Sequence, residues 1–375
     1  MSTCDQQLTK AAWRLPRNRA AMVAFFAKLA VLALLLAIPA CNTMTSSDSE
    51  SNMPVLDRAW PPPPEAARVT YLHSLKKPAD CGIRQSWLAR TAKRIVGGGR
   101  ENTLWTKPFG IALDENDNIC LTDTGMRTVY YFDRVHGRWQ SWDHIGKIRF
   151  VTPVAIAKHL DTFYVADSGL GCVLVFRSDG HLLRRITEHL AHPSGLAILG
   201  DRLLVVDSRR HCVVVFDSEG EYVAEFGCRG AGPAEFNFPT HITTDASGSI
   251  YVTDSMNNRV QVLDCNGNFQ SAIGSIGDTP GFFNRPKGVA VDSLGHVYVV
   301  DANSDDIQIF DSKGRMLLWF GASGQAEGQF WLPNGIAISR QNEIFVTDTY
   351  NRRVQVFKYL GDSTSTSTNG ASAHD

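Results

Sequence analysis

The chain has 375 residues, a formal net charge of −1 and 43% hydrophobic residues. This composition supports a large buried core, and a closed repeat domain can exceed the usual domain length. A nearly neutral chain has no bulk electrostatic field to attract nucleic acid or an anionic membrane, so both partner classes would need a local basic patch.

The first forty residues have the features of an export signal. Basic residues precede an apolar stretch from Leu29 to Ile38, which is followed by a small residue at Ala40. A basic region, an apolar core of about 7–15 residues and a small-residue cleavage point are typical of a secretory signal. The apolar stretch is too short to span a bilayer. We therefore predict a signal peptide over residues 1–40, with translation starting at Met1 or at Met22.

A cysteine follows the signal directly. The sequence Ile-Pro-Ala-Cys that ends at Cys41 resembles a bacterial lipobox, in which the cysteine is lipidated and becomes the first residue of the mature protein. Lipidation at Cys41 would make the protein an exported lipoprotein, anchored in a membrane and facing the periplasm or the cell surface. The alternative is a plain signal peptide followed by an incidental cysteine.

Two segments have compositions that do not favour folding. Residues 41–65 are rich in Ser, Thr, Asn and Pro, and they end in Trp60, four prolines and Glu65. This composition buries too little apolar surface to fold, and the proline run favours a stiff, extended spacer. We expect this segment to be a tether. The Ser/Thr-rich residues 361–375 are predicted to form a disordered tail.

Six copies of one pattern lie within residues 66–360. Each copy begins at a proline, and the clearest copies start at Pro239, Pro286 and Pro333. An aspartate closes the second apolar run of every copy. These aspartates are Asp123, Asp167, Asp207, Asp254, Asp301 and Asp348. Their spacing of 40 to 47 residues indicates a propeller or a solenoid.

The clearest copies contain four short apolar runs separated by turn-forming residues. In the fifth copy these runs are Gly288–Asp292, Val297–Asp301, Ile307–Asp311 and Arg315–Phe320. Aspartate and glycine recur together in the turns, where aspartate bonds its own backbone and glycine supplies a positive φ. Four antiparallel strands in each of six radial repeats predict an all-β fold, a six-bladed β-propeller of four-stranded blades.

The last copy lacks a fourth strand of its own, because it ends near Tyr359. The β-rich segment Arg68–Leu75 lies upstream of the first copy and is predicted to complete the last blade as an N-terminal strand. Such a closure would remove the exposed strand edges that invite aggregation. Between this strand and the first blade, residues 86–96 have the apolar spacing of a short helix, which we expect to act as a cap.

The pattern P-x-G-(I/V)-A-(V/I)-D, followed by (I/V)-(Y/F)-V-(T/V)-D and N-R-V-Q-V-F-D, resembles the NHL-repeat family of six-bladed β-propellers. The last three copies match it strongly, whereas the second and third copies depart from it at Leu199–Asp201 and Ser208–Cys212. The lead-in WPPPPE is similar to that of bacterial exported NHL proteins. The resemblance implies the propeller fold and leaves the activity open.

The six strand-end aspartates form one candidate site. A ring of carboxylates could be catalytic, but each carboxylate is also placed to accept hydrogen bonds from loop N–H groups and to pair with a loop arginine. Because the aspartate recurs in every blade, we interpret it as structural. A functional site is expected to break the symmetry of the repeats.

The third residue of each copy begins the innermost strand and should crowd the central axis. These residues are Gly110, Ala155, Gly195, His241, Gly288 and Gly335. Only His241 is large and polar, and an imidazole readily binds ligands and metals. We therefore consider His241 a candidate ligand-binding residue, with a hydrogen-bonded, space-filling histidine as the alternative.

Enzymes of similar fold provide a second hypothesis. Peptidyl-hydroxyglycine lyases, which resemble NHL propellers, bind zinc through several channel histidines, and a catalytic zinc ion requires three protein ligands. The equivalent positions here supply His241 alone. Lactonase-type propellers use a Glu/Asn/Asp calcium site, for which we find no convincing set in register. We assign no catalytic residue and predict no cofactor, and a metal ion in the channel is left as an alternative.

The loops after the second strands converge on one face of the predicted propeller. They carry the candidate ligand-binding residues Arg209, Arg210, His211, Arg259, Tyr350, Arg352 and Arg353, together with Arg127. Asp305 and Asp306 oppose these cations, and solvated charges paired with loop aspartates are the alternative interpretation. An RNA-binding face would need a stronger positive charge and more stacking aromatics, and export makes RNA an unsuitable partner.

We expect a membrane-tethered, monomeric propeller without enzymatic activity, which recognises a protein or an envelope polymer through this loop face. The alternative is a metal-dependent lyase or lactone hydrolase with its site at the central channel. A component of an envelope assembly is the third hypothesis.

Overall fold

The computed structural model describes residues 58–81 and 103–361 of the chain. The predicted signal peptide, Cys41, the predicted helix over 86–96 and the tail after residue 361 lie outside these ranges. Within these ranges, no helix is long and apolar enough to cross a membrane. The described residues belong to one compact unit, Pro54–Asp375.

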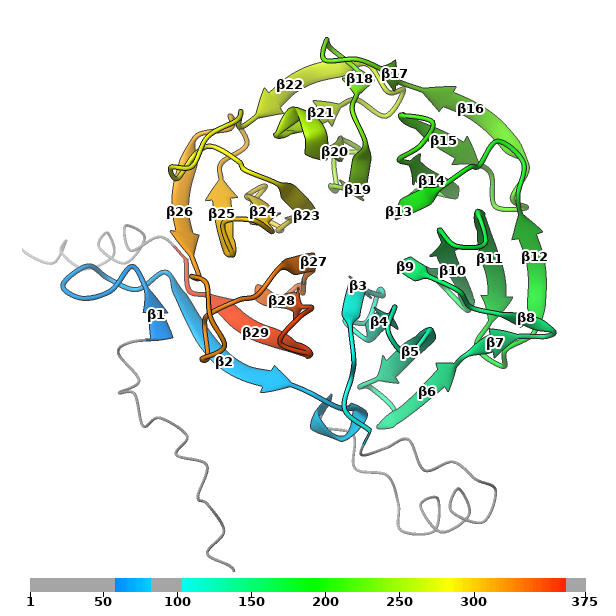
Figure 1. Cartoon of the computed structure of the whole chain (residues 1–375), viewed down its shortest axis with the longest axis horizontal. Coiled ribbons are helices and arrows are strands. Elements are labelled where there is room, and N and C mark those ends of the chain that lie inside the picture. Colours follow the sequence, from blue (N-terminus) through cyan, green and yellow to red (C-terminus); the bar gives the residue numbers. More distant parts are fainter. Residues whose placement is uncertain (1–57, 82–102, 362–375) are drawn as a thin grey trace, which may run out of the picture. The chain divides into compact units, whose positions relative to one another are not determined.

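Six antiparallel sheets are arranged radially around a central axis, with their first strands innermost (Figure 1). Blade 1 contains β3 (Pro108–Leu113), β4 (Ile119–Asp123), β5 (Thr128–Asp133) and β6 (Arg138–Trp142). Blade 2 contains β9 (Pro153–His159), β10 (Thr162–Asp167), β11 (Cys172–Arg177) and β12 (Leu182–Ile186). Blade 3 contains β13 (Pro193–Leu199), β14 (Arg202–Asp207), β15 (Cys212–Phe216) and β16 (Tyr222–Phe226).

The next two blades follow the same order. Blade 4 contains β19 (Pro239–Thr244), β20 (Ile250–Asp254), β21 (Arg259–Leu263) and β22 (Phe269–Ile273). Blade 5 contains β23 (Pro286–Val291), β24 (Val297–Asp301), β25 (Asp306–Phe310) and β26 (Met316–Phe320). The predicted six-bladed propeller of four-stranded blades is confirmed.

The sixth blade joins the two ends of the propeller. Its C-terminal strands are β27 (Pro333–Ile338), β28 (Glu343–Asp348) and β29 (Arg353–Tyr359), and its N-terminal strands are β2 (Val69–Leu75) and β1 (Ala59–Trp60). Strand β2 pairs antiparallel with β29, from Val69 opposite Tyr359 to Leu75 opposite Val354. The predicted closure by an N-terminal strand is confirmed.

The N-terminal boundary of the propeller differs from the prediction. Strand β1 pairs with β2, and the Trp60 ring lies 5.7 Å from the ring of Phe320 and 5.9 Å from that of Phe357. The prolines that follow lie between β1 and β2, and the Arg68 N–H donates to the Trp60 carbonyl oxygen at 2.7 Å. The expectation of an extended spacer is therefore wrong for residues 58–65. Composition alone does not show that a flanking tryptophan packs on a blade.

Short elements occupy the linkers and loops. Two-residue strands form the pairs β7 (His144–Ile145) with β8 (Ile148–Arg149) and β17 (Cys228–Arg229) with β18 (Glu235–Phe236). Single 3-10 turns are η2 (Pro78–Cys81) and η4 (Ser255–Asn257). These elements leave the radial order of the blades unchanged.

Apolar side chains fill the spaces between neighbouring blades. In the described part of the chain, six hydrophobic clusters each combine residues of two adjacent sheets, including the pair formed by blades 6 and 1. Phe283, for example, belongs to the linker between β22 and β23, and its side chain is fully buried. A Cβ added at Gly274 would lie 2.2 Å from the Phe283 ring. Gly274 also has a φ of +77°, so the linker needs glycine there for two reasons.

Candidate functional site

The strands of each blade alternate in direction. One side of the propeller therefore carries the starts of the innermost strands, the loops after the second strands and the linkers between blades. We call this side the loop face. The turns after the first and third strands of each blade form the opposite face. Every predicted ligand-binding residue belongs to the loop face or to the channel that starts there.

The strand-end aspartates fasten the linkers to the blades. All six are fully buried. Asp123 accepts hydrogen bonds from the N–H groups of Thr106 at 2.7 Å and Lys107 at 3.0 Å. Asp301 does the same for Asn284 at 2.6 Å and Arg285 at 2.8 Å. Bonds of this kind are needed wherever a linker enters a blade, so they account for the recurring aspartate without catalysis.

Two of the predicted ligand-binding arginines are engaged inside the fold. Arg353 is buried, its Nε lies 2.8 Å from a carboxylate oxygen of Asp348, and its Nη2 donates to the carbonyl oxygens of Ala326 and Gln329 at 2.7 and 2.8 Å. Arg259 makes the equivalent contacts two blades earlier, with its Nε 2.9 Å from Asp254. Their donors are used by the propeller itself, so we remove both from the candidate site.

The loop after β14 is also partly engaged. Arg210 forms an ion pair with Glu225 at 2.7 Å. His211 is buried, and its Nδ1 accepts a hydrogen bond from the Phe238 N–H at 3.1 Å. The rings of His211 and Phe238 also pack in a T-shaped arrangement, with 4.6 Å between their centroids. Arg209 is exposed and is the most accessible of the three. Of this loop, Arg209 therefore fits a ligand contact best.

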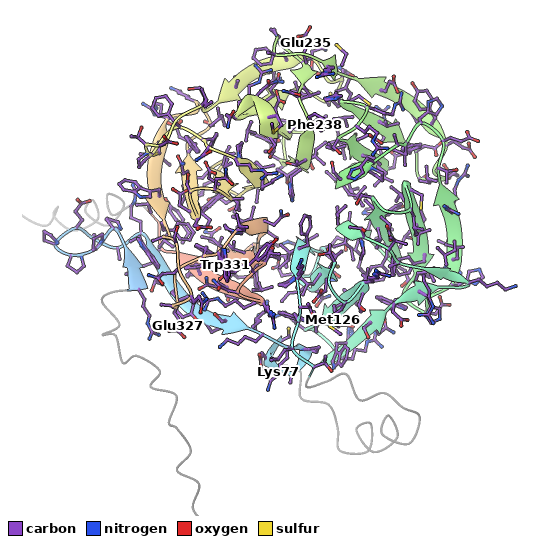
Figure 2. All side chains as sticks on the ribbon, viewed as in Figure 1. Lys77, Met126, Glu235, Phe238, Glu327 and Trp331 are labelled. Carbon is purple, nitrogen blue, oxygen red and sulfur yellow. The ribbon has the colours of Figure 1, made fainter. Side chains whose placement is uncertain are left out.

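An aromatic surface extends from blade 6. Tyr350 is 46% exposed and lies 5.6 Å from the ring of Trp331, which is exposed to the same extent. The ammonium group of Lys107 lies 5.4 Å from the Tyr350 ring. Phe238, on the linker to β19, is a further exposed aromatic; Figure 2 labels Phe238 and Trp331. Tyr350 was found from the sequence because it lies in a loop after a second strand, whereas Trp331 and Phe238 lie in linkers and were missed.

Exposed charges near the centre of the loop face are positive. Two sets of positions surround the channel: the six loops after the second strands, and the six residues that directly precede the first-strand prolines. The exposed charged side chains at these positions are Lys107, Arg127, Arg209, Arg285 and Arg352. The one carboxylate at the same positions, that of Asp305, is buried. The loop face thus combines a cationic ring with exposed aromatics, although the whole chain is nearly neutral.

A cavity of about 350 Å³ lies within the central channel. The innermost strands β3, β9, β13, β19, β23 and β27 all contribute to its wall. Most of the lining residues are aliphatic, but more polar than apolar surface faces the cavity. The residues that line the cavity include Ile111, Leu196, Ile242, Val289 and Ile336. Small-molecule pockets typically have volumes of about 300–1,000 Å³ and mostly apolar walls.

His241 lines this cavity and is the histidine that the sequence singled out. Both ring nitrogens are buried and meet no partner with hydrogen-bond geometry among the described residues. Burial lowers the pKa of His241 to about 3, and the positive charge of Lys287 adds to this effect, while the neighbouring Asn334 side chain opposes it. The imidazole is therefore neutral at physiological pH. In the ranges that the structure covers, no group of three His, Cys, Asp or Glu residues could hold a metal ion.

The second residue of each innermost strand stands next to the channel on the loop-face side. These residues are Phe109, Val154, Ser194, Thr240, Lys287 and Asn334. Their polarity is uneven, since blades 1 and 2 contribute apolar side chains and blades 3 to 6 contribute polar ones. This asymmetry is not visible from the third residue of each copy, where only His241 differs from a small residue.

Known families and structures agree with the fold. Residues 187–260 match a family model described as a 6-bladed beta-propeller, and residues 283–310 and 330–357 match the NHL repeat. No curated protein matches the chain.

Several solved structures share the architecture at low identity. An auxiliary nutrient binding protein from Bacteroides thetaiotaomicron is 13% identical, with a TM-score of 0.54, and the match covers 68% of this chain and 70% of that one. Virginiamycin B lyase from Staphylococcus aureus is 13% identical with a TM-score of 0.52, over 68% and 81% of the two chains. A streptogramin B lyase gives 11% identity and a TM-score of 0.51, over 68% and 93%. Together with the repeat matches and the six observed blades, these results identify the chain as a six-bladed β-propeller with NHL repeats.

Proposed function

We propose that the protein is a non-enzymatic binding module, tethered to a membrane through Cys41, which recognises an acidic protein or envelope polymer through its loop face. The observation that carries this proposal is the joint exposure of cationic and aromatic side chains in the loops around the channel, where the one carboxylate, that of Asp305, is buried. Trp331, Tyr350 and Arg352 belong to residue types that dominate the energetics of protein interfaces.

The scaffold supports this role. Loops held on a rigid framework are suited to recognition, because little conformational entropy is lost on binding. Each linker on the loop face is fixed by a buried aspartate such as Asp301, so the exposed side chains are presented on restrained backbone. The similarity in fold to auxiliary nutrient binding proteins is consistent with a binding role.

Charge reversal on the loop face should abolish capture of the partner. A photo-crosslinking amino acid in place of Trp331 is expected to form an adduct in cells, whereas the same group at Leu294, an exposed residue of the opposite face, forms none. Combining the Trp331 probe with Arg209→Glu and Arg352→Glu should reduce the adduct about fivefold or more, because like charges repel an acidic partner.

The matched control reverses a cation on the opposite face. Lys313→Glu changes the net charge in the same direction and should leave the adduct at Trp331 unchanged. Equal crosslinking from both faces, or an adduct insensitive to the loop-face reversals, would contradict the proposal. Digestion of the adduct by a protease distinguishes a protein partner from an envelope polymer.

A lyase or lactone hydrolase with a channel metal is the second candidate. His241, with two buried ring nitrogens in the channel, is the observation that favours it. Metal analysis of the purified mature protein tests this alternative. Stoichiometric metal that is lost in His241→Ala would favour the enzyme, and the absence of bound metal in both forms would favour the binding module.

A further inference from the structure

We propose that the loop-face end of the channel is a binding site for a carboxylate carried on a small aliphatic group, formed by Thr240, His241, Lys287 and Asn334. We call these residues the mouth cluster. This site would add a small ligand to the proposed binding function. It rests on that function in one respect, because the ligand must enter from the loop face. It names a ligand class that the exposed surface alone does not specify.

The central observation is a half-buried ammonium group, that of Lys287. Lys287 lies on β23, and no carboxylate of residues 58–81 or 103–361 forms an ion pair with it. Burial lowers the pKa of Lys287 to about 8, and the neighbouring positive charge of Arg285 contributes. A cation removed from water without an anionic partner is costly, so binding an anion beside Lys287 would be favourable.

Unpartnered polar atoms lie on the innermost strands to either side of β23. The Thr240 hydroxyl, both ring nitrogens of His241 and the Asn334 Oδ1 are buried and have no hydrogen-bond partner among the described residues. Buried polar atoms normally have partners, and four such atoms in one place are unusual. The positive charge of Lys287 and the Asn334 side chain both act on the pKa of His241.

The backbone brings these side chains to the axis. Thr240 and His241 lie on β19, Lys287 on β23 and Asn334 on β27, which are the innermost strands of three successive blades. A Cβ added at Gly288 would lie 2.5 Å from the Asn334 carbonyl oxygen, so β23 and β27 are in close contact at this level. The mouth cluster therefore belongs to three successive innermost strands, and His241 is its member that lines the cavity.

The charge of the mouth cluster favours a monoanion. His241 is neutral, Thr240 and Asn334 are uncharged, and Lys287 supplies a single positive charge. A carboxylate matches this charge, and its two oxygens can accept hydrogen bonds from the Lys287 ammonium, the Thr240 hydroxyl and the one protonated ring nitrogen of His241. Asn334 Oδ1 is itself an acceptor and can bond only to the donors of the cluster, not to the carboxylate. A phosphate dianion would leave one negative charge uncompensated in a poorly solvated site.

The surroundings favour an aliphatic group beside the carboxylate. Phe109 and Val154 form the apolar part of the same ring of second residues. His241 also lines the cavity of about 350 Å³, whose lining residues include Ile242 and Ile336. A ligand with its carboxylate at the mouth cluster can therefore place a short branched hydrocarbon group in the cavity and remove it from water.

Isovalerate is a suitable probe, and isovaleramide is its neutral, nearly isosteric control. In calorimetric titrations of the mature full-length protein, isovalerate is expected to bind and isovaleramide to bind about tenfold or more weakly, because only the acid forms a charge-assisted bond with Lys287. Lys287→Gln should weaken isovalerate binding by a similar factor. Lys313→Gln, on the opposite face, should leave it unchanged.

A second variant and two inorganic anions complete the test. Asn334→Leu should also weaken isovalerate binding, and a thermal melt establishes that each variant is folded. Equal binding of acid and amide would overturn the proposal, as would undiminished binding by Lys287→Gln. Preferential binding of chloride or phosphate over isovalerate would also overturn it.

The same titrations separate this site from the loop-face partner. Arg209→Glu with Arg352→Glu should lose the partner adduct and still bind isovalerate, so failure of one proposal does not imply failure of the other. Isovalerate that displaces the partner would show that the partner supplies the carboxylate. Simultaneous binding of both would show that the site takes a free acid.

Discussion

Deletion of residues 59–75 is expected to open the propeller and to lower its free energy of unfolding by about 5 kcal/mol or more. The deletion removes β1 and β2, and with them the buried side chains of Val69, Tyr71 and Leu75. Burial of one large apolar side chain contributes about 1.5–3 kcal/mol, so three of them together with Trp60 account for this loss. Limited proteolysis and urea unfolding would measure it.

A matched pair of point variants tests the same contact on the intact chain. Tyr71 is buried with its ring 5.6 Å from that of Phe357, whereas the adjacent Leu72 is 42% exposed. Tyr71→Ala should destabilise by about 3–5 kcal/mol and Leu72→Ala by much less. A deletion protein as resistant to protease as the wild type, or equal effects of the two substitutions, would show that the strand β2 does not hold the ring closed.

Asp306 is expected to make the protein less stable as the pH rises from about 4 to about 8. This residue occupies the position of Arg259 in blade 4 and Arg353 in blade 6, at a spacing of 47 residues on either side. Its Oδ1 is buried and has no hydrogen-bond partner in the part of the chain that the structure describes. Burial raises the pKa of Asp306 to about 7, with a further contribution from Asp301.

The sign follows from proton binding. Between the unfolded pKa and the folded pKa of Asp306, the native state binds more protons than the unfolded state, so stability falls with increasing pH. The stability contributed by protonated Asp306 is fully present below about pH 4 and is lost as the pH rises through about 7. A difference of about 3 pKa units corresponds to about 4 kcal/mol.

Urea unfolding of the wild type and of Asp306→Asn at pH 5 and pH 8 would measure this contribution. The variant should lack that part of the pH dependence, and comparison between the two proteins cancels the opposite effect of His241, whose lowered pKa removes stability on acidification. An unchanged pH profile in Asp306→Asn would refute the assignment.

Restoring the arginine of the other blades should stabilise blade 5. The guanidinium group introduced by Asp306→Arg would face the buried carboxylate of Asp301, as Arg259 faces Asp254 at 2.9 Å. It would also reach the linker carbonyl oxygens that correspond to the acceptors of Arg259. We expect Asp306→Arg to be more stable than the wild type at pH 8, and a lower stability would show that the blade 5 linker differs from its neighbours.

The repeats made most of the fold predictable. The recurring proline and aspartate place the ends of the first two strands, and the missing fourth strand after Tyr359 pointed to the segment that became β2. The structure shifts the start of that strand by one residue from the prediction, to Val69–Leu75. Trp60 was misassigned because a proline-rich composition gives no information about the partner against which a neighbouring aromatic packs.

The candidate site was less predictable than the fold. His241 was found because it breaks the symmetry of the third position. Arg259 and Arg353 looked like surface cations in the sequence, and only the structure shows that Asp254 and Asp348 bind them. Lys287 was missed because a lysine near a turn is usually solvated, and its burial depends on how three blades converge.

Pairing of β2 with β29 also has a consequence for biosynthesis. The two partners are separated by almost the whole domain, from Val69 to Tyr359, so one edge of β2 stays unpaired until β29, the last strand, has been made. Contacts between such distant parts of a chain form slowly, and intermediates with unpaired strands are prone to associate with one another. A nascent chain of this protein would therefore need protection, or rapid completion, before it becomes safe from aggregation.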